Sequence, residues 1–229
     1  MKKKLSKRFK KLLDTSKDKK VETLEEALKK VKANCTSKFN ESIDISLNLN
    51  LKQKKEEVNL RTVVNLPNGN GKKVRVAVLC EENKVNEAKD SGADVFGSEN
   101  LVKDITAGKI NFDKLVATPS MMSKMAKLGK ILGPKGLMPN PKLGTVTSDI
   151  TKAVKALKEG QIEIKNDKDY NLAASIGKKD FPDNKIIENY NAFIQTIEKD
   201  KPTGIKGNFI LSAFLTSTMG VSYKLKLKT

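Results

Sequence analysis

The segment from Leu128 to Ile150, which reads LGKILGPKGLMPNPKLGTVTSDI, constrains the fold more than any other part of the chain. It contains three prolines and four glycines, a density that excludes a continuous helix or a central strand. Apolar residues are interspersed among them, so we predict a loop of fixed shape rather than a flexible linker. Between Thr118 and Ser148 there are five lysines and no acidic residue. Such a loop suits a phosphate-rich partner, although a well-packed connection with solvated lysines explains the same pattern.

Two kinds of hydrophobic pattern alternate along the chain. Residues 43 to 51 alternate strictly between apolar and polar side chains, which predicts a strand with one buried and one wet face. The run VRVAVLC from Val74 to Cys80 is nearly continuously apolar, as in a strand buried on both faces, and alternating helical and strand patterns follow it. After Gly160 the first kind of pattern returns, and it predicts a long amphipathic helix and two terminal strands. A capping-box pattern at Thr23–Glu26 opens an early helix.

We therefore predict a protein of mixed α/β and α+β class with two domains. The first is a discontinuous antiparallel-sheet α+β domain built from residues 1–67 and 160–229. The second, residues 68–159, is an inserted three-layer α/β domain of Rossmann-like type. The two crossings between them, near Pro67 and Gly160, would form a hinge.

The chain is strongly basic. Its 45 Lys and Arg residues against 27 Asp and Glu residues give a net charge of +18, and residues 1–20 alone hold ten basic and two acidic side chains. This balance indicates an anionic partner, nucleic acid above all. Only three of the basic residues are arginines, so phosphate contacts are expected to outnumber contacts with base edges. Aromatic residues make up 5% of the chain, which favours a folded RNA recognised by its shape over a single strand.

Several classes of function find no support in the sequence. The chain has no histidine, and Cys35 and Cys80 are isolated, so neither a metal site nor a cofactor is expected. The GxGxxG and GxxxxGK[ST] patterns are absent, so we do not expect an enzyme or a small-molecule substrate. Two lone cysteines suit a reducing cytosol. No apolar stretch is long enough to span a membrane and none resembles a signal peptide, so we expect a cytoplasmic protein without a membrane partner.

Several motifs are shared, in the same order, with one known family. Besides the glycine- and proline-rich segment, they are RTVVNLPNGNGKKVRVAVL from Arg61 to Leu79, SGADVFGSENLVKDI, FDKLVATPSMMSKMAKLG, and STMG from Ser217 to Gly220. Together they span nearly the whole chain, which closely resembles the universal family of the first protein of the large ribosomal subunit. Members of that family build the mobile stalk beside the E site.

The resemblance implies the same two-domain arrangement, with Pro67, Asn68 and Gly160 as hinge residues. It implies a structural constituent of the large subunit that binds the ribosomal RNA stalk and assists the movement and release of deacylated E-site tRNA. It also implies that excess protein, a monomer off the ribosome, binds its own operon mRNA and represses translation. The expected location is cytoplasmic and ribosome-associated. The alternative is a free RNA-binding translational regulator outside the ribosome, whose chemistry at the RNA face would be identical.

The resemblance places RNA contacts in two motifs of the discontinuous domain. In the first motif, Lys38 would neutralise a phosphate and Phe39 would lie against a ribose or a base edge. Glu41, which precedes Ser42 in the same motif, would accept a hydrogen bond from a 2′-hydroxyl or hold a lysine in position. The residues alone leave open that Phe39 belongs to the core and that Glu41 is a solvated strand end.

The second motif consists of Ser217, Thr218, Met219 and Gly220. Small hydroxyl residues with a glycine let the main chain approach a sugar–phosphate surface and donate N–H groups to it. Met219 would supply a flexible apolar contact surface. A plain strand-to-strand turn is the alternative.

Three positions depart from the family pattern. Ala173 and Asn68 stand where bacterial relatives often have histidine, and Val221 stands where proline usually follows the glycine of the second motif. The position of Ala173 is linked to the RNA face, so we expect a modest loss of affinity that Asn171 or neighbouring lysines offset. No loss of the fold is expected.

Overall fold

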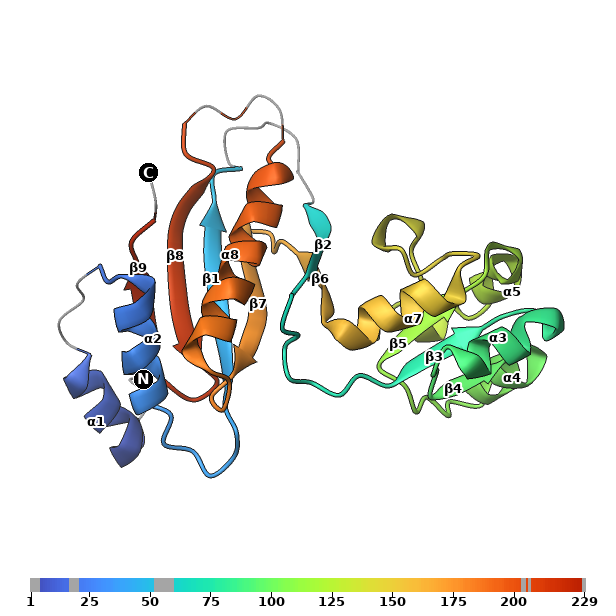
Figure 1. The fold of residues 1–229 in the computed structure, drawn as a ribbon, viewed down its shortest axis with the longest axis horizontal. Helices are drawn as coiled ribbons and strands as arrows, with labels where there is room; N and C mark the ends of the chain where they lie inside the picture. Colours follow the sequence, from blue (N-terminus) through green and yellow to red (C-terminus); the bar gives the residue numbers. More distant parts are fainter. Residues whose placement is uncertain (1–4, 17–20, 52–59, 203–204, 206, 228–229) are drawn as a thin grey trace. The chain divides into compact units, whose positions relative to one another are not determined.

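The computed structural model describes residues 5–16, 21–51, 60–202, 205 and 207–227. The protein is of mixed α/β class and contains an antiparallel sheet and a parallel sheet. The chain divides into two compact units (Figure 1), which we call the terminal unit (Met1–Gly71 with Ile162–Thr229) and the central unit (Lys72–Gln161). Their boundaries fall a few residues after those predicted at 67/68 and 159/160.

A four-stranded antiparallel sheet forms the framework of the terminal unit, in the strand order β7-β1-β8-β9. The strands are β1 (Ser42–Leu49), β7 (Asn171–Lys178), β8 (Ile210–Ser217) and β9 (Tyr223–Leu225). Every second residue of β1 is at most 1% exposed, namely Ile43, Ile45, Leu47 and Leu49. The predicted alternation is thereby confirmed, and the sheet has one apolar and one polar face.

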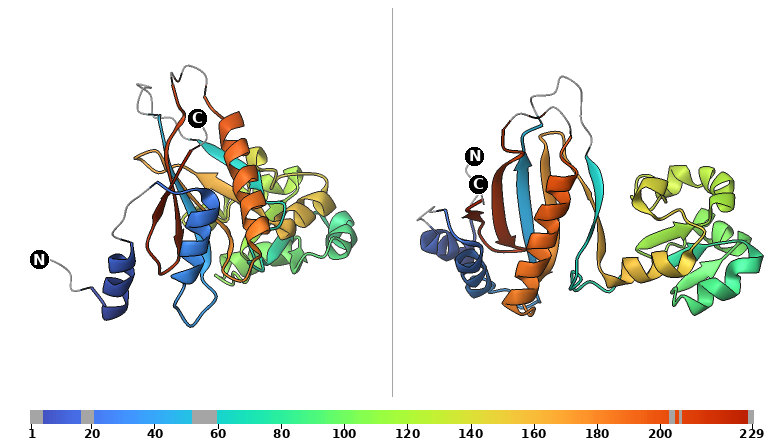
Figure 2. Two further views of the ribbon diagram at one scale, coloured as in Figure 1. Left: turned by 60° about the vertical axis from the view of Figure 1, so that its left-hand side comes forward. Right: turned by 45° about the horizontal axis from the view of Figure 1, so that its top comes forward.

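Two helices pack on the apolar face of this sheet (Figures 1 and 2). Helix α2 (Leu24–Ala33) begins with the predicted capping box, in which the Thr23 hydroxyl accepts from Glu26 N and the Glu26 carboxylate accepts from Thr23 N. Helix α8 (Asp183–Lys199) is amphipathic and contributes Ile186, Phe193 and Ile197 to the core. Polar residues of β1 on the opposite face stay half-exposed.

The basic N-terminal arm contains a helix, α1 (Lys7–Thr15), that the sequence patterns did not predict. The Ser6 hydroxyl caps it by accepting a hydrogen bond from Phe9 N. Leu12 is 6% exposed and belongs to the core of the terminal unit, and Phe9 packs against the same core. The remainder of the arm, residues 1–4 and 17–20, lies outside the described residues. Apolar burial therefore anchors α1 to the terminal unit.

Two further strands, β2 (Arg61–Asn65) and β6 (Gln161–Lys165), form a separate two-stranded sheet. The chain turns after β2 at Pro67, where Gly69 N donates to Leu66 O at 3.1 Å. Gly69 has a φ of 65°, a left-handed conformation that favours glycine. The turn therefore has a defined shape.

Asn68, predicted as a hinge residue, is held in place by α8. Its N–H donates to Oδ1 of Asn189 at 3.0 Å, and its side-chain amide donates to Oε2 of Glu188 at 2.7 Å. Asn189 is fully buried and donates from Nδ2 to the carbonyl oxygens of Gly69 and Ile176, both at 2.8 Å. Rotation of the backbone at Asn68 would break these hydrogen bonds to α8.

The central unit is built on a parallel sheet in the order β4-β3-β5. Strand β3 (Val76–Leu79) lies in the middle, flanked by β4 (Val95–Gly97) and β5 (Lys114–Ala117). All four residues of β3 are fully buried. This confirms the strand that was predicted to be covered on both faces.

Helices cover both faces of the parallel sheet and complete three layers. Helices α3 (Val85–Asp90) and α7 (Ile150–Glu159) share one apolar cluster with β3. The other cluster joins β3 to α4 (Glu99–Thr106), α5 (Met122–Ala126) and α6 (Gly129–Leu132). Short 3₁₀ turns also occur, at Glu82–Lys84, Pro119–Met121 and Pro141–Leu143. Helix α7 is capped by Gly160, whose φ of 116° is a left-handed conformation that favours glycine.

The glycine- and proline-rich segment of the central unit follows a fixed course. Oδ1 of Asn140 accepts from Lys142 N at 2.9 Å, and Asn140 N donates to Oγ1 of Thr145 at 2.8 Å. The segment is joined to β5 because Ala117 N donates to Thr145 O at 3.0 Å. Within the segment, the side chain of Leu143 is buried. These contacts confirm the predicted loop of fixed shape.

Candidate nucleic-acid interface

The two predicted RNA-contact motifs meet at one end of the antiparallel sheet. Residues 37–42, the entry loop, lead into β1, and residues 217–220, the exit turn, follow β8. Strands β1 and β8 are antiparallel neighbours in this register. Where the two strands meet these segments, Thr218 N donates to Ser42 O at 3.1 Å and Ser42 N donates to Oγ1 of Thr218 at 3.0 Å. Residues about 176 positions apart in the chain are thus held side by side.

Glu41 joins the entry loop to the exit turn. Its side chain is fully buried, with Oε1 accepting from Ser37 N at 3.0 Å and Oε2 accepting from Met219 N at 3.1 Å. Burial alone would raise the pKa of this carboxyl group, but hydrogen bonds from the N–H groups of Ser37 and Met219 hold the pKa below its usual value. The group is therefore a buried carboxylate whose charge is stabilised by N–H groups of both segments.

This geometry contradicts the predicted role of Glu41 as a direct RNA contact, because its side chain does not reach the surface. The alternative of a solvated strand end is wrong for the same reason. Ser217 is only 3% exposed and cannot offer its hydroxyl to RNA either. Glu41 instead fixes the separation of the entry loop and the exit turn.

The main-chain N–H groups of the exit turn are already hydrogen-bonded within the protein. The N–H groups of Thr218, Met219 and Gly220 each donate, at 3.1 Å, to an acceptor within the terminal unit. This contradicts the expectation that the turn donates N–H groups to a sugar–phosphate surface. Gly220 is required for another reason, since a Cβ atom there would lie 2.3 Å from Oγ of Ser217. The turn is therefore a closed, tightly packed element.

The entry loop and exit turn expose a small set of side chains. Phe39 is 53% exposed and Met219 is 48% exposed, which excludes the alternative that Phe39 belongs to the core. Lys38 and Thr218, their neighbours in sequence, are exposed as well. Two apolar side chains, a hydroxyl and a cation on a fixed backbone suit contact with ribose rings and base edges beside a phosphate.

Asn171 and Ala173 do not belong to this cluster. They pair across β1 with Asn48 and Ser46, so Asn171 is six strand positions away from Ser42, or about 20 Å. They lie on the polar face of the sheet, where Ala173 is exposed. The predicted contacts therefore fall into two places on the terminal unit.

The side-chain amide of Asn171 is already engaged. Its Oδ1 accepts from Nδ2 of Asn48 at 2.6 Å, and its Nδ2 donates to Oδ2 of Asp167 at 3.1 Å. Asp167 also accepts from Asn171 N at 2.7 Å. These contacts contradict the expectation that Asn171 replaces the missing histidine at position 173, because its amide stabilises the loop before β7.

Motif reasoning missed a residue that reaches the exit turn from α1. Nη2 of Arg8 donates to Met219 O at 2.6 Å, and Nη1 donates to Oγ1 of Thr36 at 2.8 Å. The sequence offered one hint that Arg8 has a specific role, because it is one of only three arginines among 45 basic residues.

The central unit offers a second cationic surface, on its glycine- and proline-rich segment and the helices before it. All five lysines singled out in the sequence are exposed: Lys124, Lys127, Lys130, Lys135 and Lys142. Lys124 forms an ion pair with Glu99, with 2.8 Å between Nζ and Oε1. The surface presents positive charge on a fixed backbone, which suits a phosphate backbone of any sequence.

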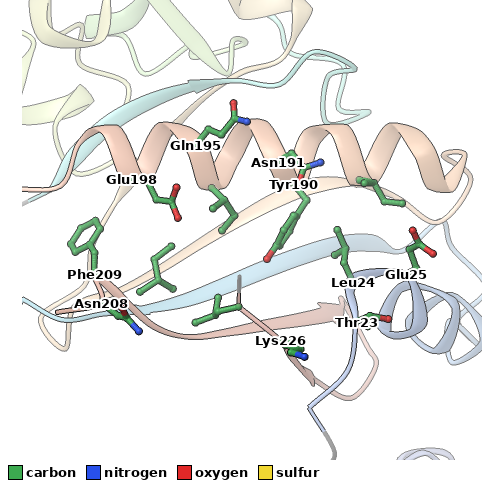
Figure 3. Close-up of a pocket in the computed structure, with 14 residues that line it drawn as sticks. Thr23, Leu24, Glu25, Tyr190, Asn191, Gln195, Glu198, Asn208, Phe209 and Lys226 are labelled. Carbon is green, nitrogen blue, oxygen red and sulfur yellow. The ribbon is translucent and has the colours of Figure 1, made fainter. Parts of the chain in front are cut away.

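A groove of about 950 Å³ opens on the helix side of the terminal unit (Figure 3). It lies between α8, the start of α2 and the ends of β8 and β9, and Leu24 and Phe209 contribute to its apolar wall. Burial raises the pKa of Tyr190 in this wall, and the negative charge of Glu198 adds to the shift. Lys226 is the only cation among its described lining residues, so we place no nucleic acid there.

Within the described part of the chain, no group of three or more His, Cys, Asp or Glu side chains could hold a metal ion. None of the described helices has the length and apolarity that a membrane span requires. Cys35 and Cys80 are both buried free thiols, and burial raises the pKa of each.

Comparison with known proteins agrees with these features. The Ribosomal protein L1p/L10e family matches residues 28–221. The chain is 57% identical over 223 residues to large ribosomal subunit protein uL1 of Pelagibacter ubique (strain HTCC1062), covering 97% of both chains. It is 44% identical over 225 residues to large ribosomal subunit protein uL1c of Phaeodactylum tricornutum (strain CCAP 1055/1), covering 98% of both chains.

A third relative, large ribosomal subunit protein uL1 of Rickettsia bellii (strain OSU 85-389), is 48% identical over 201 residues, covering 88% of this chain and 84% of the relative. The family predicted from the sequence motifs is therefore confirmed. The match extends across both units, and the chain belongs to the ribosomal protein L1 family.

Proposed function

We propose that the protein is a structural constituent of the large ribosomal subunit that binds the large-subunit ribosomal RNA at the mobile stalk beside the E site. Its relatives are named as large-subunit proteins, and the family consists of structural ribosomal proteins. The observation that carries the proposal is the pairing of exposed Phe39 and Met219 with a backbone that Glu41 fixes from below. A net charge of +18 supplies the general attraction to RNA.

We further propose that the two units act as separate domains, with the terminal unit gripping the stalk RNA. Because Asn68 is bonded to α8, the pivot of the first crossing follows Gly71 rather than lying at Pro67 or Asn68. Gly160, which lacks a Cβ and ends α7, serves the second crossing. The exposed lysines of the central unit attract the phosphates of deacylated E-site tRNA during its movement and release.

A second role follows from recognition by shape. Since the exit turn offers apolar contacts and few donors, any RNA with the same backbone shape fits it, including a copy of the stalk site on the protein's own operon mRNA. Free protein would then be a cytoplasmic monomer that represses translation of that messenger. The competing proposal is a free RNA-binding regulator that never enters the ribosome.

Sedimentation of cell extracts through a sucrose gradient separates these two proposals. A ribosomal constituent co-migrates with the large subunit, whereas a free regulator stays near the top of the gradient. In parallel, the full chain is titrated with a stalk RNA fragment. We expect Met219→Asp to abolish specific binding through desolvation and repulsion and Met219→Leu to retain it. Equal binding by both variants would show that the exit turn is not the RNA surface.

A further inference from the structure

Helix α1 is docked beside the exit turn by two kinds of contact. Leu12 and Phe9 pack into the core of the terminal unit, and Leu12 is only 6% exposed. On the neighbouring side of the helix, the half-buried Arg8 reaches the main chain of the exit turn. Apolar contacts thus hold the helix, and a directed polar contact sets which side faces the turn.

The Arg8 guanidinium bridges two segments that frame the proposed RNA surface. Nη1 donates to Oγ1 of Thr36, which precedes the entry loop, at 2.8 Å, and Nη2 donates to Met219 O in the exit turn at 2.6 Å. The planar fork of an arginine can make both bonds at once, whereas a lysine presents a single ammonium group. The bridge therefore depends on arginine geometry as well as on positive charge.

Arg8 and Glu41 bond to different main-chain groups of the same exit-turn residue, Met219. Glu41 accepts from Met219 N at 3.1 Å, while Arg8 donates to Met219 O at 2.6 Å. The main-chain groups of Met219 are thereby fixed by one carboxylate and one guanidinium. Its side chain, 48% exposed, is left as the part that meets a partner.

Two exposed lysines flank Arg8 on α1. Lys7 and Lys11 are one helical turn apart, and Lys11 is three residues after Arg8, so all three share one side of the helix. Lys10 is also exposed, but it lies on the side of α1 opposite Arg8, because it is two residues from Arg8, and it borders Lys7 three residues earlier. Positive charge therefore continues from the exit turn onto one side of α1.

We propose that α1 extends the RNA-binding surface of the terminal unit. Arg8 is a positioning residue that fixes the helix against the exit turn, and Lys7 and Lys11 neutralise phosphates of the RNA seated on Met219 and Phe39. The inference rests on the proposed binding of stalk RNA and adds a site that the two motifs do not include.

The first test uses the full chain and a stalk RNA fragment, titrated at several salt concentrations. Each phosphate that is no longer neutralised lowers the log–log salt slope by about 0.8 and the affinity about fivefold at 0.15 M salt. We therefore expect Lys7→Gln with Lys11→Gln to weaken binding about twentyfold. The matched control, Lys29→Gln with Lys199→Gln, removes the same net charge from exposed positions of α2 and α8 and should cost about twofold or less.

The second test separates positioning from charge. Arg8→Lys keeps the charge but cannot form both bonds, so we expect it to weaken binding nearly as much as Arg8→Gln. In the Arg8→Gln background, the Lys7 and Lys11 substitutions should have little further effect, because the helix is no longer fixed beside the RNA. Thermal unfolding of each variant confirms that the core packing of Leu12 persists.

The outcomes distinguish this inference from the function on which it rests. If the parent chain binds stalk RNA and the Lys7 and Lys11 variant behaves like its control, α1 is no part of the surface. Full binding by Arg8→Lys would overturn the positioning role of Arg8. A parent chain that does not bind stalk RNA at all would overturn the proposed function itself.

Discussion

The exit turn of the terminal unit and the glycine- and proline-rich loop of the central unit are both fixed by side chains bonded to the main chain, yet they present different chemistry. In the exit turn, buried Glu41 ties two distant segments together and leaves apolar Met219 outside. In the loop, Asn140 and Thr145 form bonds between residues a few positions apart and leave lysines outside. The turn suits one RNA shape, and the loop suits any phosphate backbone.

This difference teaches how specificity and attraction can be divided within one chain. Recognition that depends on shape is weakened when a substitution displaces the backbone, whereas attraction that depends on charge weakens when salt is added. Substitutions in the turn should therefore change the affinity for stalk RNA, and substitutions in the loop should change the salt dependence of weaker binding. The following variants test that division.

Gly220→Val should have the largest effect. Its Cβ would lie 2.3 Å from Oγ of Ser217, and the branched valine side chain adds two further methyl groups there, so the buried Ser217 hydroxyl or the exit turn must move. We expect about a hundredfold loss of affinity for stalk RNA, measured by titration calorimetry, which corresponds to about 2.7 kcal/mol. The control is Gly136→Ala in the loop, where no atom lies within 4 Å of the new Cβ. That variant costs about 1 kcal/mol of backbone strain at φ +67° but should bind stalk RNA like the parent.

Glu41→Gln should have the next largest effect. The glutamine amide turns one acceptor into a donor, so one of the N–H groups of Ser37 and Met219 loses its partner. We expect a loss of about 2 kcal/mol in the free energy of unfolding and about a tenfold loss of affinity for stalk RNA. Glu82→Gln, at an exposed position of the central unit, serves as the control and should change neither. Unchanged unfolding of Glu41→Gln would contradict the buried bridge.

The same variant carries a pH signature. Because the folded pKa of Glu41 lies below its usual value of 4.5, its stabilising effect is present above that pH and is lost as the pH falls through the folded pKa. The difference in unfolding free energy between the parent and Glu41→Gln should therefore be constant near pH 7 and shrink below pH 4.5. A difference that grew on acidification would have the wrong sign for a buried carboxylate.

Phe39→Ala should have a moderate effect confined to binding. The ring is 53% exposed, so its removal should hardly change thermal unfolding, while the loss of stacking on the RNA should weaken binding about tenfold. Leu211→Ala removes another apolar side chain that is 51% exposed, at the start of β8, and should leave binding intact. Equal affinities of the two variants would show that Phe39 makes no specific contact.

Neutralising the loop should have the smallest effect on stalk RNA. We expect the combined change of Lys127, Lys130, Lys135 and Lys142 to glutamine to alter that affinity by less than about twofold. Weak binding to tRNA should respond instead, with the log–log salt slope falling by about 0.7 to 0.9 for each phosphate that the variant no longer neutralises. A large loss of stalk RNA affinity would mean that the central unit shares in the specific surface.

The sequence predicted those features of the fold that repeat along a single element. The alternation in β1 and the continuous apolar run of β3 report burial directly, because the period of the pattern is set by the strand itself. The capping box of α2 is equally local, since Thr23 and Glu26 are three residues apart. The break between α5, which ends at Ala126, and α6, which begins at Gly129, was not predicted.

The details of the candidate site escaped sequence reasoning because they depend on contacts between distant residues. Glu41 and Met219 are 178 positions apart, and Arg8 and Met219 are 211 positions apart, so no local period encodes either contact. A glutamate beside an exposed phenylalanine looks the same in sequence whether it is buried or solvated. Asn189 gave a usable hint, because it lies on the apolar side of α8 with Ile186 and Phe193.

The position of β1 in its sheet has a consequence for how the protein is made. Both neighbours of β1, strands β7 and β8, come after the central unit in the chain. Synthesis at about 5–20 residues per second therefore leaves both edges of β1 unpaired for roughly 6 to 26 seconds, until β7 has been made. The central unit is continuous in sequence and can fold during that wait. Protecting one apolar strand from mispairing is thus a task for the nascent chain and its chaperones.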